Sequence, residues 1–283
     1  MTMSLNEPTG WSAWTERMRK RWLPPPRNRA VPWGGAEVFV VLAGFGLAIP
    51  AMSYVAVKQL FHVTAHEDGL IFGLALATGV ITVLGAPLVM RMMCGAQPYQ
   101  IGLHRDRCLR NVLLGFGTYL LAAPLVMAIM ALAFHTFEPT PHEIEKIIRR
   151  SPTPGYFALA TLCAVVIAPL QEELLFRGIL LPWLRRLLGP RWAITLSALI
   201  FSALHSNAWP APIPLFVLAL FLGYLAHHTN SLVGPITLHA TFNTVSMFVL
   251  LLMVFLDQKA LSPPIDASTL TGLAVITSIV RGL

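Results

Sequence analysis

Long apolar stretches alternate with short polar connections along most of this chain. A helix needs about 20 apolar residues to cross the hydrocarbon core of a bilayer, and several stretches reach that length. The pattern therefore predicts an all-α polytopic membrane protein with about eight transmembrane helices. The stretches cover residues 36–57, 69–90, 111–134, 156–181, 192–208, 213–226, 232–256 and, with a weaker signal, 267–280. The fifth and sixth are short, so we expect them to tilt, to pair or to re-enter.

The composition agrees with this class of protein. Hydrophobic residues make up 55% of the 283 residues and charged residues only 12%, with a mean hydropathy of +0.67. Soluble domains carry about 25% charged residues, so an ordinary soluble protein is excluded. Cys94, Cys108 and Cys163 show no paired spacing. We therefore expect free thiols, without structural disulfides or a thiolate metal site.

The positions of lysine and arginine predict the orientation, because basic residues near the ends of spans are retained in the cytoplasm. With eight spans, one side of the membrane receives 14 basic residues and the other side five, and Arg177 falls within the membrane. We therefore expect both termini to be cytoplasmic, in the cell (inner) membrane. Topology and attraction to anionic headgroups explain the net charge of +7, so no nucleic-acid partner is expected.

The first 35 residues differ from the rest of the chain. They are basic and contain Trp11, Trp14, Trp22 and Trp33, which is typical of a cytoplasmic segment that lies at the membrane interface. No apolar core precedes a small-residue cleavage site, so we expect no signal peptide. The predicted organisation is thus an N-terminal segment at 1–35 and a transmembrane helical domain at 36–283, with the candidate chemistry at about 155–256.

Three ionisable residues interrupt the fourth apolar stretch. Within APLQEELLFRG, Glu172, Glu173 and Arg177 lie at membrane depth, where such groups are expensive and usually functional. Arg177 follows Glu173 by four residues, so these two are expected to form an ion pair on one helix face. Glu172 is then left without a countercharge in its own helix, which makes it the candidate general base. The alternative is that both carboxylates pair with Arg177 and only brace the helix.

Two later apolar stretches carry further polar pairs at helical spacing. Phe201 and His205 lie four residues apart in FSALH, and His239 and Asn243 lie four residues apart in HATFN. Residues at this spacing share a helix face. A single histidine in a membrane helix is more often a hydrogen-bond partner than a catalyst. Two histidines, an amide and a glutamate on three helices instead favour one active site within the helical bundle.

These residues resemble the motifs of a known family, the CPBP intramembrane proteases, named for CAAX proteases and bacteriocin-processing enzymes (Abi-type) and including the type II CAAX prenyl endopeptidases. The family motifs are EExxxR, FxxxH and HxxxN or HxxxD. This chain has EELLFR, FSALH and HATFN in that order, over roughly residues 155–256. Each motif is short, but three in order on successive membrane segments make a specific signal.

The resemblance implies an endopeptidase that cleaves a peptide bond in a membrane-associated protein or peptide, lipidated or not, in CAAX-type processing or a related maturation. It implies that Glu172 and His205 activate a water molecule and that His239 and Asn243 stabilise the oxyanion of the tetrahedral intermediate. Glu173, Arg177 and Phe201 would support these four residues.

Other interpretations of the same residues stay open. Glu172, His205 and His239 would also suit a zinc site with two histidines and one carboxylate. The chain has no HExxH motif, and the neighbouring carboxylate that could orient such ligands is expected to pair with Arg177. We therefore expect no metal and no cofactor. A different class of function is a non-catalytic membrane scaffold or immunity-like protein, in which Asn243 only ties its helix to a neighbour.

Overall fold

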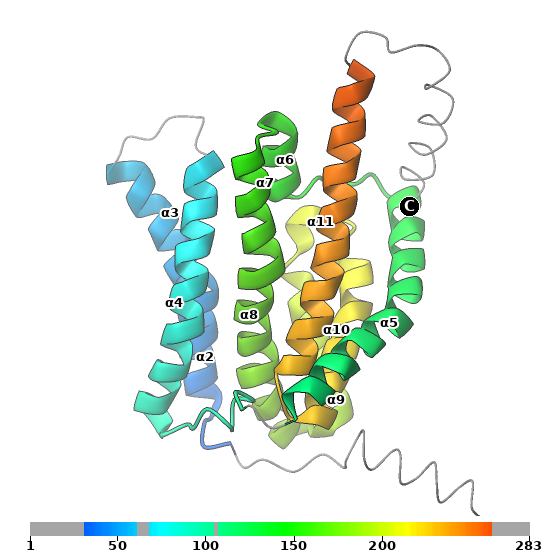
Figure 1. Cartoon of the computed structure of the whole chain (residues 1–283). Helices are drawn as coiled ribbons and strands as arrows, with labels where there is room; N and C mark the ends of the chain where they lie inside the picture. Colours follow the sequence, from blue (N-terminus) through cyan, green and yellow to red (C-terminus); the bar gives the residue numbers. More distant parts are fainter. Residues whose placement is uncertain (1–30, 61–67, 105–106, 262–283) are drawn as a thin grey trace, which may run out of the picture.

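The computed structural model describes residues 31–60, 68–104 and 107–261, and the elements within them are all helical. Figure 1 shows them as a bundle of long, roughly antiparallel helices. The α-helices are α2 (Gly35–Ala43), α3 (Ile49–Leu60), α4 (Asp68–Cys94), α5 (Cys108–Thr136), α6 (Glu143–Arg150), α7 (Pro154–Thr161), α8 (Ala168–Glu173), α9 (Leu181–Ala203), α10 (Pro212–Thr229) and α11 (Val233–Leu261).

Six helical stretches in the described part of the chain are long and apolar enough to cross a membrane. They are Gly35–Val57, Gly69–Cys94, Cys108–Thr136, Pro154–Ala203, Pro212–Thr229 and Val233–Asp257. The predicted all-α, polytopic architecture is confirmed, and the chain is an integral, multi-pass membrane protein. The predicted number of about eight spans is not confirmed, and the predicted stretch at 267–280 lies outside the described residues.

The fourth stretch contains two of the predicted segments, because the chain turns back within it. Gly189 interrupts the helix with φ 74° and ψ 171°, and the left-handed φ is accessible to glycine without the steric cost that a side chain brings. In a straight helix, Phe176 and Phe201 would lie about 37 Å apart. Their ring centroids are only 5.2 Å apart, so the residues after Gly189 run back along the residues before it.

Three π-helical turns are built into the spans: η1 (Gly44–Ala48), η2 (Leu162–Ile167) and η3 (Leu174–Leu180). A π-turn breaks the regular i to i−4 hydrogen-bond ladder, and such turns are often found at functional sites. In each of them a backbone carbonyl accepts a hydrogen bond from a distant part of the chain, and in η1 the donor is Thr82 Oγ1, which lies 3.5 Å from Phe45 O. Trp33 Nε1 donates to Ile179 O at 3.1 Å in η3, and Asn243 Nδ2 donates to Ala164 O at 2.7 Å in η2.

Trp33 corrects one expectation from the sequence. The sequence placed it in an interfacial N-terminal segment, but its side chain is fully buried in the same apolar cluster as Leu174 and Phe201. Its buried indole N–H needs an acceptor, and the carbonyl of Ile179 in η3 supplies one. The other three tryptophans of that segment, Trp11, Trp14 and Trp22, lie outside the described residues.

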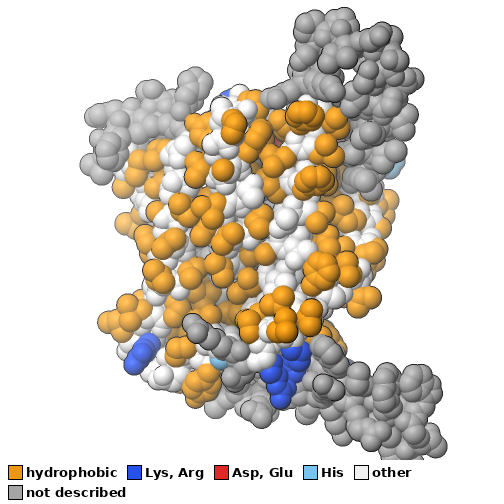
Figure 2. Space-filling model, viewed as in Figure 1, with side chains coloured by type: hydrophobic (Ala, Val, Ile, Leu, Met, Phe, Trp, Pro, Cys, Tyr) orange, Lys and Arg blue, Asp and Glu red, His pale blue; other side chains and the backbone are white. Residues whose placement is uncertain are grey.

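Apolar side chains cover the sides of the bundle (Figure 2). Large hydrophobic residues from several spans are exposed there, among them Phe39, Leu84, Leu121 and Phe248. Patches of this extent mark contact with a partner or a membrane, and their distribution over all the long helices fits the lipid-facing surface of an integral membrane protein.

Arginine and lysine gather at the two ends of the bundle. At one end, where α4 ends and α5 begins, lie Arg91, Arg107, Arg110, Arg185, Arg186 and Arg191. At the other end α6 carries Lys146, Arg149 and Arg150. The six arginines of the larger group are among the residues that the sequence assigns to the cytoplasm, and the orientation stays a prediction.

Candidate active site

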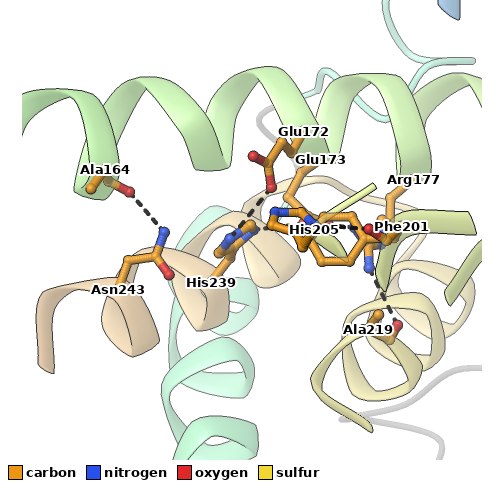
Figure 3. A network of polar contacts seen from close by, with 9 residues as sticks. All are labelled: Ala164, Glu172, Glu173, Arg177, Phe201, His205, Ala219, His239 and Asn243. Atoms are coloured by element: carbon orange, nitrogen blue, oxygen red, sulfur yellow. Dashed lines mark hydrogen bonds and ion pairs between the residues drawn. The ribbon is translucent and has the colours of Figure 1, made fainter. Parts of the chain in front are cut away.

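The residues of the three sequence motifs come from different helices and meet inside the bundle (Figure 3). Glu172 and Glu173 end α8, and Arg177 follows within the π-helical turn η3. His205 lies in the turn that follows α9, before the short 3-10 helix η4 (Ser206–Ala208). His239 and Asn243 lie one turn apart on α11. The network joins elements that are far apart in the sequence.

Glu173 and Arg177 form the ion pair that their spacing predicted. Arg177 Nη1 donates to Glu173 Oε1 at 3.0 Å, and both side chains are almost completely buried. Arg177 also donates from Nη2 to Ala219 O at 3.3 Å, and its guanidinium carbon lies 4.6 Å from the centre of the Phe201 ring. The ion pair therefore ties α8 to α9 and α10 in addition to bracing its own helix.

Glu172 points to a different side of the helix from Glu173, as adjacent helical residues must. Its side chain keeps 25% of its surface exposed, whereas the side chain of Glu173 is fully buried. Glu172 Oε2 lies 3.7 Å from His239 Nε2, which is beyond ordinary hydrogen-bond distance. Of the two neighbouring carboxylates, only that of Glu172 is partly exposed.

His239 lies between the two glutamates. Its Nδ1 is 2.9 Å from Glu173 Oε1, and a carboxylate that pairs with arginine can only accept a hydrogen bond. Nδ1 therefore carries a proton and donates it to Glu173. The other ring nitrogen, Nε2, is directed toward Glu172 (Figure 3). Glu173 thus fixes the orientation of the ring and one of its two protonation sites.

His205 has its orientation fixed by a backbone carbonyl. Its Nδ1 lies 2.9 Å from Phe201 O, and because a carbonyl oxygen only accepts, Nδ1 must be the donor. In the neutral ring, Nε2 then carries the lone pair and can accept a hydrogen bond. The predicted contact with Phe201 is present, since the two ring centroids lie 4.9 Å apart. The Phe201 ring in turn packs against His239, with 6.0 Å between centroids.

Asn243 makes a contact that the sequence pattern did not reveal. Its amide nitrogen donates to the carbonyl of Ala164 at 2.7 Å, which joins α11 to the π-helical turn η2. This is the tie between helices that the sequence left open as an alternative to an oxyanion donor. A primary amide carries two N–H groups, so this hydrogen bond occupies one and leaves the other.

His142 is a residue near the site that sequence reasoning assigned no role. It caps the N-terminus of α6, and its Nδ1 accepts from the backbone N–H of Ile144 at 3.2 Å. The pKa of His142 lies below its ordinary value, chiefly because surrounding protein atoms desolvate the ring and secondly because of the charge of His205; Glu172 acts on it in the opposite direction. His142 therefore lies within electrostatic range of both residues. In the sequence, the only signal for His142 is its position directly before an amphipathic helix.

A metal site is not formed by this arrangement of the residues. In the described part of the chain, no group of three histidine, cysteine, aspartate or glutamate side chains lies close enough to hold a metal ion. Cys94, Cys108 and Cys163 are free thiols, as predicted. The carboxylates, imidazoles and amide that meet in the bundle can take part in acid–base and hydrogen-bond chemistry.

The part of the chain that carries the three motifs matches a known family. Residues 154–245 match the family model described as "Rce1-like: Type II CAAX prenyl endopeptidase Rce1-like". This range contains all three motifs and confirms the resemblance drawn from them. No curated protein and no solved structure matches the chain. The match covers less than half of the chain, so the activity of that family enters as a proposal below.

Proposed function

We propose that the protein is an intramembrane endopeptidase in which Glu172 activates a water molecule for attack on a peptide bond. One observation carries this proposal: of the two neighbouring glutamates, Glu173 is fully buried and bound to Arg177 and His239, whereas Glu172 remains partly exposed. A general base must be accessible to water and free to accept its proton. The partial exposure of Glu172 and its position outside the ion pair support it in this role.

His205 supports the same step. With Nδ1 donating to Phe201 O, its Nε2 offers a lone pair to a water molecule. A water bound between Glu172 and His205 would donate one hydrogen to each, which leaves its own lone pair for the carbonyl carbon of the substrate. Glu172 takes the proton as the C–O bond forms, and the same proton then passes to the amide nitrogen as the C–N bond breaks.

The oxyanion that forms on the substrate carbonyl needs hydrogen-bond donors. The family resemblance assigns this role to His239 and Asn243. Since Nδ1 of His239 already donates to Glu173, a donor at Nε2 requires the imidazolium form of the ring. Asn243 would use the N–H that does not bind Ala164. Glu173 and Arg177 then act as positioning residues, because they hold His239 and the helices in place.

The substrate that fits this class is a membrane-associated protein or peptide, lipidated or not, processed in a CAAX-type or related maturation. We place the enzyme in the cell (inner) membrane with both termini cytoplasmic, on the distribution of basic residues at the two ends of the bundle. No cofactor or metal ion is part of the proposed reaction.

The test compares the termini of membrane proteins in cells that carry wild type, Glu172→Gln or the control Glu143→Gln. Glu143 is an exposed glutamate on α6 that pairs with Lys146, so this variant loses the same charge outside the network drawn in Figure 3. We expect termini that appear with wild type and Glu143→Gln and are missing with Glu172→Gln at equal protein level in the membrane. Identical termini in all three would favour the scaffold or immunity-like alternative and overturn the proposal.

A further inference from the structure

A cavity of about 560 Å³ lies at the end of the bundle where the chain turns between the two halves of α9 and where α10 gives way to α11. Its walls come from the turn at residues 100–102, from η3 and the first part of α9, and from the end of α10. Arg177 forms part of the wall. The cavity is thus separate from Glu172 and His205 but shares one residue with the network around Glu173.

The formal charges of the cavity wall are all positive. They belong to Arg177, Arg185 and Arg186; His227 also lines the cavity, and the fourteen lining residues in the described part of the chain include no aspartate or glutamate. Arg177, Leu181 and Arg185 recur every four residues and so form one face of the helix. Arg185 is half-buried and forms no ion pair with any described residue, yet it lies close enough to His227 to act on it electrostatically.

Two deeply buried polar atoms in this wall have no hydrogen-bond partner among the described residues. They are Nε of Arg177 and Nδ1 of His227, whose residues are 3% and 8% exposed. A buried polar atom without a hydrogen-bond partner is unfavourable, and more so when the group is charged. Both atoms belong to residues that line the cavity, and Nε of Arg177, which can only donate, needs an acceptor.

The chemistry of the wall selects the kind of occupant. Guanidinium groups present planar arrays of donors that match phosphate oxygens in a bidentate geometry. Basic pockets between membrane helices at the cytoplasmic end are typical sites for anionic lipid headgroups. The volume also exceeds what a single carboxylate would fill, and the wall includes the apolar residues Leu181, Ala226 and Leu232.

We propose that this cavity is a binding site for a phosphate group, carried either by the headgroup of an anionic phospholipid or by a soluble phosphate. Arg185 and His227 bind the phosphate oxygens, and Arg177 contributes from the wall that it shares with the Glu173 network. The site does not depend on proteolysis, so it stands independently of the function proposed above.

The test uses the full chain, purified in a neutral detergent and stripped of lipid. Phosphatidylglycerol, phosphatidylcholine and inorganic phosphate are titrated separately, and binding is followed by thermal stability and by lipid adducts in native mass spectrometry. The variant is Arg185→Gln and the matched control is Arg191→Gln, since Arg191 is an exposed arginine at the same end of the bundle that does not line the cavity. Arg177 is left unchanged because it belongs to the network around the active site.

We expect phosphatidylglycerol to stabilise wild type and Arg191→Gln, and Arg185→Gln to weaken its apparent affinity by about tenfold or more, as the loss of a charge-assisted hydrogen bond predicts. A response to inorganic phosphate as well identifies any phosphate group as the ligand, whereas a response to phosphatidylglycerol alone identifies the lipid headgroup. If Arg185→Gln and Arg191→Gln respond equally to phosphatidylglycerol, the binding arises from general surface charge and the proposal is overturned. No response of wild type to either phosphate source would also overturn it.

Discussion

His239 Nδ1 and Arg177 Nη1 share one acceptor, because both donate to the same oxygen of Glu173, at 2.9 Å and 3.0 Å. The second oxygen of Glu173 has no hydrogen-bond partner among the described residues. The buried carboxylate therefore connects the arginine of the first sequence motif with the histidine of the third. Because of this connection, we expect a substitution at Glu173 to lower stability, whereas a substitution at Glu172 should abolish cleavage.

Glu173→Gln should chiefly lower the stability of the protein. The amide keeps the size of the side chain but removes the negative charge, so Arg177 is left as an uncompensated buried cation, a change that typically destabilises by about 3–5 kcal/mol. We expect a clear fall in Tm in detergent, together with a fall in kcat because His239 then donates to a neutral amide oxygen instead of a carboxylate. A Tm within one degree of wild type would show that the ion pair does not stabilise the bundle.

Asn243→Ala separates two roles of one side chain. Loss of the hydrogen bond to Ala164 O should lower stability by about 1 kcal/mol. Loss of an oxyanion donor should in addition lower kcat about 10²- to 10³-fold with a smaller effect on KM. Asn243→Asp should also lower kcat, because a carboxylate cannot donate.

The matched control for Asn243 is Thr244→Ala on the same helix, whose exposed hydroxyl donates only to Ala240 O of its own helix. The measurements are kcat for each folded molecule and Tm in detergent. If Asn243→Ala changes Tm alone, then Asn243 ties α11 to η2 and takes no part in the reaction.

Removal of metal ions should leave the rate unchanged. The proposed reaction uses a carboxylate and an imidazole to activate water, and the chain lacks an HExxH motif. The measurement is the rate of substrate cleavage before and after treatment with a chelator, with metal content determined on the same preparation. Activity that is lost on chelation and restored by zinc would replace the glutamate mechanism with a metal-activated water.

Gly115→Ala and Gly117→Ala should shift stability in opposite directions. Both residues lie in α5, but a Cβ at Gly115 would meet Gly234 O at 2.5 Å and Thr237 Cβ at 2.8 Å, whereas a Cβ at Gly117 would meet nothing within 4 Å. Overpacking against the backbone of α11 costs about 1–3 kcal/mol, while alanine in an open helical position gains up to about 1 kcal/mol over glycine.

We therefore expect a lower Tm for Gly115→Ala and an unchanged or higher Tm for Gly117→Ala. Because α11 carries His239 and Asn243, Gly115→Ala should also lower kcat. Equal Tm values for the two variants would mean that α5 and α11 do not approach as closely as the structure shows.

Local spacing was sufficient to predict the features of the site that lie within one helix. The Glu173 and Arg177 pair follows from a separation of four residues. The same separation suggested a shared face for Phe201 and His205, and their rings do lie close together, although His205 lies in the turn after α9. The lengths of the apolar stretches were likewise sufficient to predict a helical membrane bundle, because the bilayer sets the length of a span.

Contacts between distant residues could not be predicted from these patterns. The acceptor of Asn243 lies 79 residues earlier in the chain, and Trp33 reaches a carbonyl 146 residues later. Both acceptors are carbonyls in π-helical turns, and hydrophobic periodicity does not reveal where a helix changes from α to π. Nor could it show that Glu173 would bind His239, since that contact depends on how α8 and α11 pack.

Within the π-helical turn η3, the local geometry depends on how many residues the chain has as well as on which residues they are. A π-turn holds one residue more than an α-turn, because its hydrogen bonds join residues i and i+5 instead of i and i+4. Deleting Ile179 would leave the letters EELLFR intact, yet it would convert the π-turn to an ordinary α-turn. The carbonyl that accepts from the buried indole N–H of Trp33 would be lost with it. A homologue could thus keep every motif and still differ at this end of the bundle through a change of one residue in length.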